Sequence, residues 1–382
     1  MSGLDQPLCR LCKSELVQPP LLSMFPFPKA AQYYPENQEF ESDRGITLEV
    51  FRCSYCDLLQ LSCEPVAYYR EVITATSFSA EMKAARLSEF SIFVERFDLL
   101  GKRAIEVGCG KGGMVDVMVD AGLNAVGMEN GVLSVEEAQL AGRNVVQGYL
   151  DIFDVNEEEK FDVFVSFNYI EHQPDTQNFV RGLHRISKPG AVGYVTAPNA
   201  SYLLKTHTLY EFVADHLIYF TEETMRLAFE LNGFDVVNSA IINGENDIAL
   251  TVRKREQVPI QGRGSVELLV KELSHFVSQH TVRGKKVAVW GAGHRTLALL
   301  SMAKLNGITF IVDSADFKQG KYSPVMHTPI VSPSTLEYSD IDVVIVMVPG
   351  IYPDEVINTI RSFSRTFEIY KLLDNRLVLE KP

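Results

Sequence analysis

The chain lacks any long apolar run and any excess of positive charge. No segment of its 382 residues approaches the roughly 20 consecutive apolar residues that a membrane-spanning helix needs. The N-terminus from Met1 to Pro7 has no basic start and no apolar stretch, so no signal peptide is expected there. With 49 acidic and 36 basic residues, the net charge is −13, which disfavours sequence-independent binding to nucleic acid. We therefore expect a cytoplasmic protein with reduced thiols and with no membrane or nucleic-acid partner.

The length and composition indicate a packed protein of more than one domain. Apolar residues make up 46% of the chain and charged residues 22%, and 382 residues suffice for two or three domains. A polar segment with Pro and Gly is typical of a linker and separates two α/β patterns. We expect a module at residues 1–66, a core at 67–253, a linker at 254–265 and a C-terminal domain at 266–382.

Four of the six cysteines form two Cys-x-x-Cys pairs. The pairs are Cys9 with Cys12 and Cys53 with Cys56. Such turns place two thiolates on one side of a knuckle, and two knuckles complete a tetrahedral zinc site. The 40 residues between the pairs exceed the usual zinc-ribbon spacing, so two unrelated pairs or a set of disulfides are the alternatives. We expect a structural zinc ion, because four thiolates leave no open position for a substrate.

A glycine-rich turn follows a short apolar run at Glu106-Val107-Gly108-Cys109-Gly110. An apolar periodic segment comes next, so we expect a strand, a tight loop and a helix start. The glycines let a ligand approach main-chain N–H groups, although many nucleotide-binding folds share this pattern. Glu129 follows a second short strand, and a carboxylate at that place is the usual holder of ribose hydroxyls. Cys109 is expected to be a packing residue rather than a nucleophile.

Strand and helix patterns alternate along the middle of the chain. This alternation predicts a mostly parallel sheet with helices on both faces, and ligands then bind at the carboxyl ends of the strands. Residues 248–252 are expected to complete an antiparallel edge. The other strands are expected at residues 103–107, 124–128, 144–147, 161–167, 191–197 and 234–241.

Polar side chains cluster at three places around this core. The run from Asn168 to His172 directly follows a predicted strand, and the pair Asp215-His216 lies between apolar residues ahead of an N-cap at Thr221. A third cluster precedes a helix expected from about residue 80 to 99, and it is either N-cap chemistry or a lid over a cofactor. Its members are Tyr68, Tyr69, Thr74, Thr76, Ser77 and Ser79.

A second strand–glycine–helix unit begins near residue 287 with Gly291-Ala292-Gly293. Its next strand ends at Asp313, and a further strand ends before Pro349. Thr296 stands where a dinucleotide fingerprint has its third glycine, so NAD is not inferred. The pattern predicts a second, smaller α/β domain.

Taken together, these features resemble the sugar C-methyltransferase family over almost the whole chain. The resemblance rests on the four-cysteine module, the Glu106-x-Gly108-x-Gly110 loop and the C-terminal unit, whose motifs are the most family-specific. Those motifs are Gly291-Ala292-Gly293, Val312-Asp313, Lys318-Gln319-Gly320-Lys321-Tyr322-x-Pro324 and His327-Thr328-Pro329-Ile330. The family implies a Rossmann-like class I methyltransferase core with an N-terminal zinc module and a second, smaller C-terminal α/β domain.

The resemblance also implies S-adenosylmethionine as the methyl donor and assigns residues to it. Gly108 and Gly110 would face its methionine part, and Glu129 would hold its ribose hydroxyls. Asp151 would approach the adenine. The remaining expected cofactor residues are Glu106 ahead of the loop and Phe167 and Asn168 at the pocket edge.

The expected catalytic residues follow from an acid–histidine pair that precedes a tyrosine in this family. Asp215-His216 and Tyr219 resemble it, with Asp in place of the usual Glu. We expect His216 to be the base and His172 to assist enolate formation, since a histidine pKa lies near working pH. Val213 stands where the sugar enzymes tend to have a tyrosine, and residues 73–77 replace a Tyr-Ser-Ser-like segment.

These departures leave three functions open. The first is C-methylation of a nucleotide-linked keto-deoxysugar or a similar small polar substrate, by a monomer or a homodimer. The second is O- or N-methylation of another small metabolite. The third is a cofactor-binding protein that has lost its catalytic groups.

Overall fold

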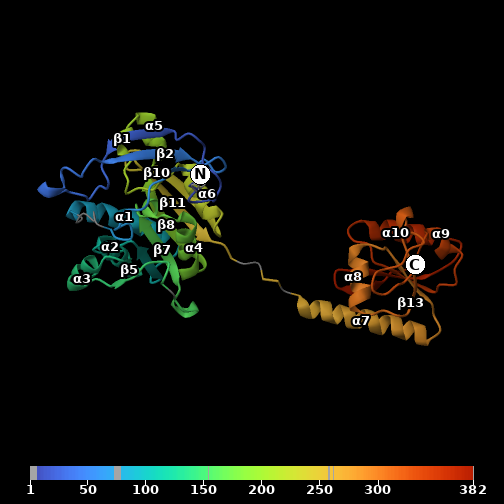
Figure 1. Cartoon of the computed structure of the whole chain (residues 1–382). Helices are drawn as coiled ribbons and strands as arrows, with labels where there is room; N and C mark the ends of the chain where they lie inside the picture. Colours follow the sequence, from blue (N-terminus) through green and yellow to red (C-terminus); the bar gives the residue numbers. More distant parts are fainter. Residues whose placement is uncertain (1–6, 73–78, 154, 257–258, 261, 382) are drawn as a thin grey trace. The chain divides into compact units, whose positions relative to one another are not determined.

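The chain divides into two compact units, Met1–Gln257 and Val258–Pro382 (Figure 1). The computed structural model describes residues 7–72, 79–153, 155–256, 259–260 and 262–381. Thr74, Thr76 and Ser77 of the predicted polar cluster lie outside the described residues. Among the described residues, no helix is long and apolar enough to cross a membrane.

The first unit is built on a seven-stranded sheet with the order β10-β11-β8-β7-β4-β5-β6. The five strands β8, β7, β4, β5 and β6 are each parallel to their neighbours in this order. Strand β11 is antiparallel to both β8 and β10. The strands are β4 Arg103–Val107, β5 Asn124–Glu129, β6 Val145–Gln147, β7 Phe161–Phe167, β8 Ser187–Pro198, β10 Phe234–Ile242 and β11 Asp247–Lys254. A strand is present at each of the six other positions predicted for the core, so the prediction of an α/β core is confirmed.

The prediction that residues 248–252 form an edge is wrong. The strand is antiparallel as expected, but it lies between β8 and β10, and β10 forms the edge. Residues 248–252 are all buried, whereas most of β10 is at least partly exposed. A nearly continuous apolar run is typical of a strand that is covered on both faces, and the stretch from Ile248 to Val252 is apolar except for Thr251.

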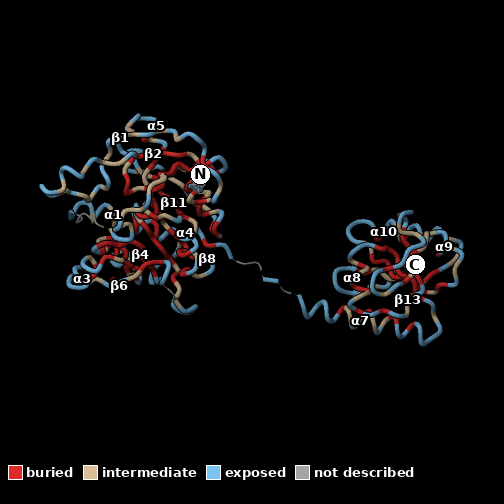
Figure 2. Tube along the Cα trace, in the orientation of Figure 1, coloured by how far each residue is buried: buried red, intermediate tan, exposed pale blue. Residues whose placement is uncertain are grey.

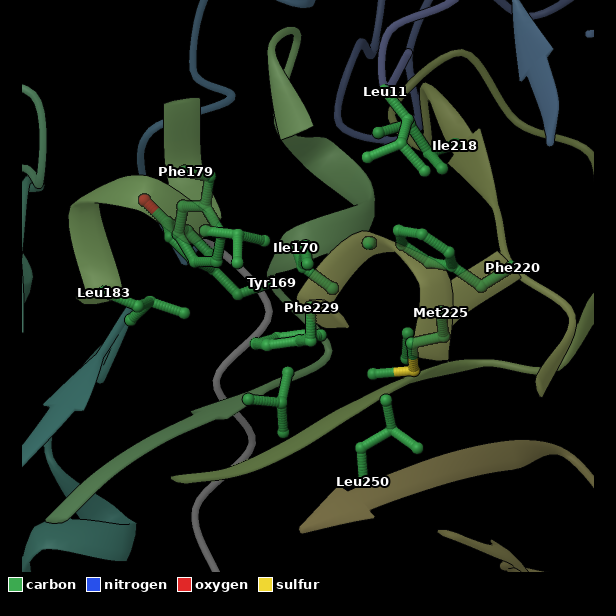
Figure 3. Packing of buried hydrophobic residues seen from close by; sticks show 14 of the residues in the cluster. Leu11, Tyr169, Ile170, Phe179, Leu183, Ile218, Phe220, Met225, Phe229 and Leu250 are labelled. Carbon is green, nitrogen blue, oxygen red and sulfur yellow. The ribbon is translucent and has the colours of Figure 1, made fainter. Parts of the chain in front are cut away.

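Helices cover both faces of this sheet. Alternate strand residues point to opposite faces, so Ala104 packs with α1, α2 and α3 while Ile105 packs with α4 and α6. Figure 3 shows the second of these layers, with Phe229 and Met225 of α6 above Leu250 of β11. The helices are α1 Ala80–Arg96, α2 Gly113–Asp120, α3 Val132–Leu140, α4 Thr176–Ile186, α5 Ala200–Thr206 and α6 Glu222–Glu230. Short 3-10 helices are η1 Asn37–Glu39, η2 Glu157–Glu159, η3 Ile170–His172 and η4 Leu209–Glu211.

The N-terminal segment forms a small antiparallel sheet with the order β1-β2-β3-β9. Three of its strands are β1 Leu22–Phe27, β2 Ile46–Arg52 and β3 Leu59–Leu61. The fourth, β9 Ile218–Tyr219, comes from the core segment just after His216. Leu11 packs in the same apolar cluster as Ile218 and Phe220 (Figure 3). The cysteine-bearing segment is therefore packed directly against the segment that carries the predicted catalytic pair.

The second unit has a six-stranded sheet with the order β14-β13-β12-β15-β16-β17. Only β17 is antiparallel to its neighbour. The strands are β12 Val287–Trp290, β13 Ile308–Val312, β14 Ile330–Val331, β15 Val343–Val346, β16 Glu368–Leu373 and β17 Arg376–Leu379. The helices are α7 Arg263–Val282, α8 His294–Met302, η5 Asp316–Lys318, α9 Pro333–Glu337 and α10 Tyr352–Arg361. Figure 2 shows the buried residues of this unit on its strands, with exposed positions along α7.

The glycine turn of the second unit is closed by its own side chains. Asp313 accepts hydrogen bonds from the backbone N–H groups of Ala292 at 2.7 Å and Ala315 at 2.9 Å. Lys318 also binds the same carboxylate at 2.9 Å, and these contacts lower the pKa of Asp313 against the effect of burial. The acid that would hold a ribose in a dinucleotide site is thus neutralised within the unit.

Candidate active site

Three of the predicted catalytic residues line one cavity in the first unit. Its volume is about 300 Å³, and Asn168, His172, Asp215 and His216 line it. These residues come from the end of β7, from η3 and from the loop before β9, while the segment around Ala31 closes the cavity from the N-terminal side. The sequence pattern thus brings together three of the four predicted catalytic residues.

Asp215 anchors the N-terminal segment rather than the histidine beside it in sequence. The side chain is only 6% exposed. Its Oδ1 accepts a hydrogen bond from the Tyr68 hydroxyl at 2.6 Å, and its Oδ2 accepts one from the Ala31 N–H at 2.6 Å. Burial and this carboxylate raise the pKa of Tyr68 to about 12, so the phenol stays protonated and donates. Asp215 therefore fixes the shape of the cavity wall.

His172 and His216 meet as a pair inside the cavity. Their rings lie edge to face with centroids 4.7 Å apart. Because a carbonyl oxygen only accepts, His172 Nδ1 donates to the Asp215 carbonyl oxygen at 2.8 Å, which leaves His172 Nε2 as the acceptor of a neutral ring. Burial, and then the neighbouring His172, lower the pKa of His216 to about 3, and burial also lowers the pKa of His172. Both rings are neutral at pH 7 and are able to accept a proton.

Tyr219 lies behind this pair and does not line the cavity. Its hydroxyl accepts from the Val213 N–H at 2.7 Å and donates to the Val213 carbonyl oxygen at 3.2 Å. Its ring packs against Phe212 with centroids 4.4 Å apart. Tyr219 thus holds the loop that carries Asp215 and His216, and its hydroxyl is already engaged.

The glycine loop lies at the carboxyl end of β4, next to Glu129. Gly108 and Gly110 have φ angles of +75° and +52°, and a Cβ at Gly108 would come within 2.5 Å of the Tyr169 ring. The Glu129 carboxylate accepts from the N–H of Gly110 at 2.9 Å and of Gly131 at 2.8 Å. Glycine is required at position 108 because its conformation and the close aromatic ring both exclude a side chain.

Glu106 and Glu129 are both buried beside this loop. They are 4% and 1% exposed, and burial raises the pKa of each carboxyl. Among the described residues, Glu106 Oε2 has no hydrogen-bond partner. A buried acceptor without a partner is costly, so a ligand with N–H or O–H donors would fit at this place. The Val72 N–H, at 3.4 Å from Glu129 Oε1, connects this loop with the cavity, because Val72 lines it.

The other predicted cofactor residues are spread along the same edge. Asn168 lines the cavity and donates from Nδ2 to Asp247 at 3.2 Å. Phe167 packs against Tyr194 with centroids 5.8 Å apart, and the exposed Asp151 accepts a hydrogen bond from Asn178 of α4. Only Asn168 of these residues faces the cavity.

Glu171 is a cavity residue that sequence reasoning did not assign. It lies in η3 between the strand and His172, and it is 1% exposed. Burial raises the pKa of Glu171 to about 8. Its carbonyl oxygen accepts from the Leu217 N–H at 2.9 Å, which ties η3 to the loop of His216. The polar run after β7 was the available signal, but burial of this acid depends on a segment more than forty residues away.

The four paired cysteines lie together at one end of the N-terminal segment. All four Sγ atoms are within 4.8 Å of one another. Cys9 Sγ accepts from the N–H groups of Leu11 at 3.4 Å and Cys12 at 3.5 Å, and Cys53 Sγ accepts from those of Tyr55 and Cys56, each at 3.4 Å. Four sulfur donors in two N–H-supported turns are a set that a tetrahedral zinc ion takes. Cys63 and Cys109 are outside this group.

Two family models match the chain. A methyltransferase domain matches residues 80–239, and a C-methyltransferase C-terminal domain matches residues 261–366. The first match covers the glycine loop and His216, and the second covers most of the second unit.

Curated relatives match a shorter part of the chain. A ubiquinone biosynthesis O-methyltransferase of Pseudomonas syringae pv. tomato is 33% identical over 111 residues, which is 28% of this chain and 48% of the relative. The corresponding protein of Pseudomonas aeruginosa is 31% identical over the same length. The chain thus matches about half the length of these curated relatives.

Solved structures of methyltransferases also match part of the chain at low similarity. An S-adenosylmethionine-dependent methyltransferase from Mesorhizobium loti has a TM-score of 0.36 at 15% identity, over 44% of this chain and 100% of that chain. The magnesium protoporphyrin IX methyltransferase of Synechocystis, solved with bound SAH, has a TM-score of 0.37 at 16% identity. The match covers 47% of this chain and 89% of that chain. The chain is thus similar to a methyltransferase domain over residues 80–239 and to a C-methyltransferase C-terminal domain over residues 261–366.

Proposed function

We propose that the protein transfers a methyl group from S-adenosylmethionine to a carbon next to a carbonyl, in a nucleotide-linked keto-deoxysugar or a similar small polar substrate. The observation that carries this proposal is the neutral His172–His216 pair, which faces the same cavity as Asn168. The match of residues 261–366 to a C-methyltransferase C-terminal domain supports carbon as the methylated atom.

The residues around the glycine loop fit the methyl donor. Positive φ angles at Gly108 and Gly110 leave room for a close ligand, and the partnerless oxygen of Glu106 would take a donor group. Glu129 would hold the ribose hydroxyls at the end of β5, and Asp151 would approach the adenine from beyond β6. When it is bound, this cofactor supplies an electrophilic methyl group on a sulfonium.

The chain's own residues would prepare the acceptor carbon. His216 accepts the proton from the carbon next to the carbonyl, because its ring is neutral and is held in the cavity. His172 stands beside it, and its orientation is fixed by the hydrogen bond to the Asp215 carbonyl oxygen. Tyr68, Asp215 and Ala31 close the wall around these rings, which excludes water from the developing enolate.

A deuterium exchange experiment tests this proposal. The probe is thymidine-diphosphate-linked 4-keto-6-deoxyglucose in D₂O, with the enzyme but without S-adenosylmethionine. We expect deuterium to enter the carbon next to the carbonyl, as detected by NMR, and exchange to stop in His216→Ala. A wild-type protein that methylates an acceptor but exchanges no carbon-bound hydrogen would contradict C-methylation.

O-methylation is the second candidate, and one observation favours it. The curated relatives that match 111 residues of this chain are named O-methyltransferases. In that case His216 would deprotonate a hydroxyl, and no carbon-bound hydrogen would exchange. A protein that binds the cofactor but methylates no member of a metabolite panel would instead favour a non-catalytic role.

The cysteine group is proposed to hold one structural zinc ion. Elemental analysis should find one zinc per chain, and Cys53→Ser should bring the content close to zero and lower the thermal midpoint, since structural zinc contributes folding free energy directly. Cys63→Ser is the matched control, because its thiol lies outside the group, and it should keep its zinc. A folded wild-type protein without metal would end this proposal.

A further inference from the structure

Glu171 is a buried acid whose place in the cavity has no structural explanation. Among the described residues, its Oε2 has no hydrogen-bond partner, and the side chain is 1% exposed. A carboxyl buried in this way costs free energy, so it needs either a ligand or a chemical role. An apolar residue of similar volume would fill the same space without that cost.

The position of Glu171 relative to the two histidines suggests such a role. One carboxylate oxygen and one ring nitrogen each of His172 and His216 all lie within 4.8 Å of one another. Within the described part of the chain, the ring of His216 has no hydrogen-bond partner. A single bridging water would connect Glu171 and His216 over a separation of this size.

The electrostatics of the cavity set the direction of proton movement. Burial disfavours an imidazolium at His216, because burial and His172 lower its pKa to about 3. Burial disfavours a carboxylate at Glu171, and burial together with the smaller effect of the Asp247 charge raises the pKa of Glu171 to about 8. A proton taken up by His216 is therefore more stable on an ionised Glu171 than on the imidazole.

We propose that Glu171 is a further catalytic residue, the carboxylate that receives the substrate proton from His216. This inference rests on the proposed C-methylation. The carbon–hydrogen bond breaks and leaves its electron pair on the enolate, while the proton moves to His216 and then to a Glu171 oxygen. The enolate carbon forms the bond to the methyl group, and the broken carbon–sulfur bond leaves its pair on sulfur. Glu171 then releases the proton to solvent.

The relay predicts a characteristic pH dependence. Glu171 must be ionised to accept the proton. The exchange rate should therefore be constant well above the pKa of about 8 and fall about tenfold per pH unit below it, and we call this fall the acid limb. The other titratable groups facing Glu171 are His172, His216, Tyr219 and Asp247. Both histidines are already neutral across this range, and burial raises the pKa of Tyr219. Titration of these three residues therefore does not produce the acid limb.

The test measures deuterium exchange into thymidine-diphosphate-linked 4-keto-6-deoxyglucose from pH 6 to pH 9.5. Glu171→Gln should lower the rate at high pH roughly 10²-fold and abolish the acid limb, while S-adenosylmethionine affinity stays near wild type. Glu171→Asp should restore a limb at a reduced rate. Asp247→Asn should keep the limb but move its midpoint to lower pH, because removal of the negative charge favours ionisation of Glu171.

The outcomes separate this inference from the function on which it rests. Wild-type exchange with an unchanged rate and limb in Glu171→Gln would overturn the relay and leave C-methylation standing. Absence of exchange in the wild type would contradict the proposed C-methylation and the relay together. A lowered rate with the limb intact would show that Glu171 only supports the shape of the cavity.

Discussion

Replacement of His216 by alanine is expected to lower methyl transfer by about 10²–10⁴-fold, the range usual for loss of a general base. The ring is the neutral acceptor of the cavity, and no other group in the loop before β9 takes its place, since Asp215 is engaged by Tyr68 and Ala31. Product formation is measured with radiolabelled methyl donor. S-adenosylmethionine affinity, measured by calorimetry, should stay near the wild-type value.

The matched control is His207→Asn. His207 is exposed at the end of α5 and has a φ angle of +59°, which asparagine tolerates well. This variant should retain wild-type activity. Retained activity in His216→Ala would remove His216 as the base, and lost cofactor affinity in the same variant would indicate damage to the fold instead.

Replacement of Glu129 by alanine is expected to weaken S-adenosylmethionine binding about 100-fold, since two hydrogen bonds to a charged acceptor are lost. The carboxylate also accepts from the N–H groups of Gly110 and Gly131, so its loss frees the glycine loop as well. Calorimetric titration with S-adenosylmethionine measures the change. Glu129→Gln should show an intermediate loss, because the amide keeps one acceptor oxygen.

Glu136→Ala is the control for this experiment. Glu136 is an exposed acid of α3, seven positions after Glu129, and has the same charge. It should bind the cofactor like the wild type. Equal affinity in Glu129→Ala and wild type would exclude the ribose-holding role that the resemblance implies.

The core of the first unit was readable from sequence because each strand has a clear local signal. Strands β4, β5 and β7 are short, mostly apolar runs followed directly by Gly108, Asn130 and Asn168, and they form at the predicted residues. The position of β11 was misjudged because a strand's place in a sheet depends on its partners. Its nearly continuous apolar run was nevertheless a signal for burial on both faces.

The site was only partly readable, because its walls come from distant segments. The resemblance selected His172 and His216, which do meet in the cavity. The contact of Tyr68 and Ala31 with Asp215 joins residues about 150 to 180 positions apart, and no local pattern predicts it. Tyr219 was expected at the reacting centre, but its hydroxyl forms hydrogen bonds to the Val213 backbone instead.

The most direct test of the account is the bond made by the transferred methyl group. The enzyme is incubated with ¹³C-methyl-labelled S-adenosylmethionine and thymidine-diphosphate-linked 4-keto-6-deoxyglucose, and the product is examined by carbon–proton correlation NMR. The account predicts a methyl group bonded to the carbon next to the carbonyl. A methyl group bonded to oxygen or nitrogen would contradict it.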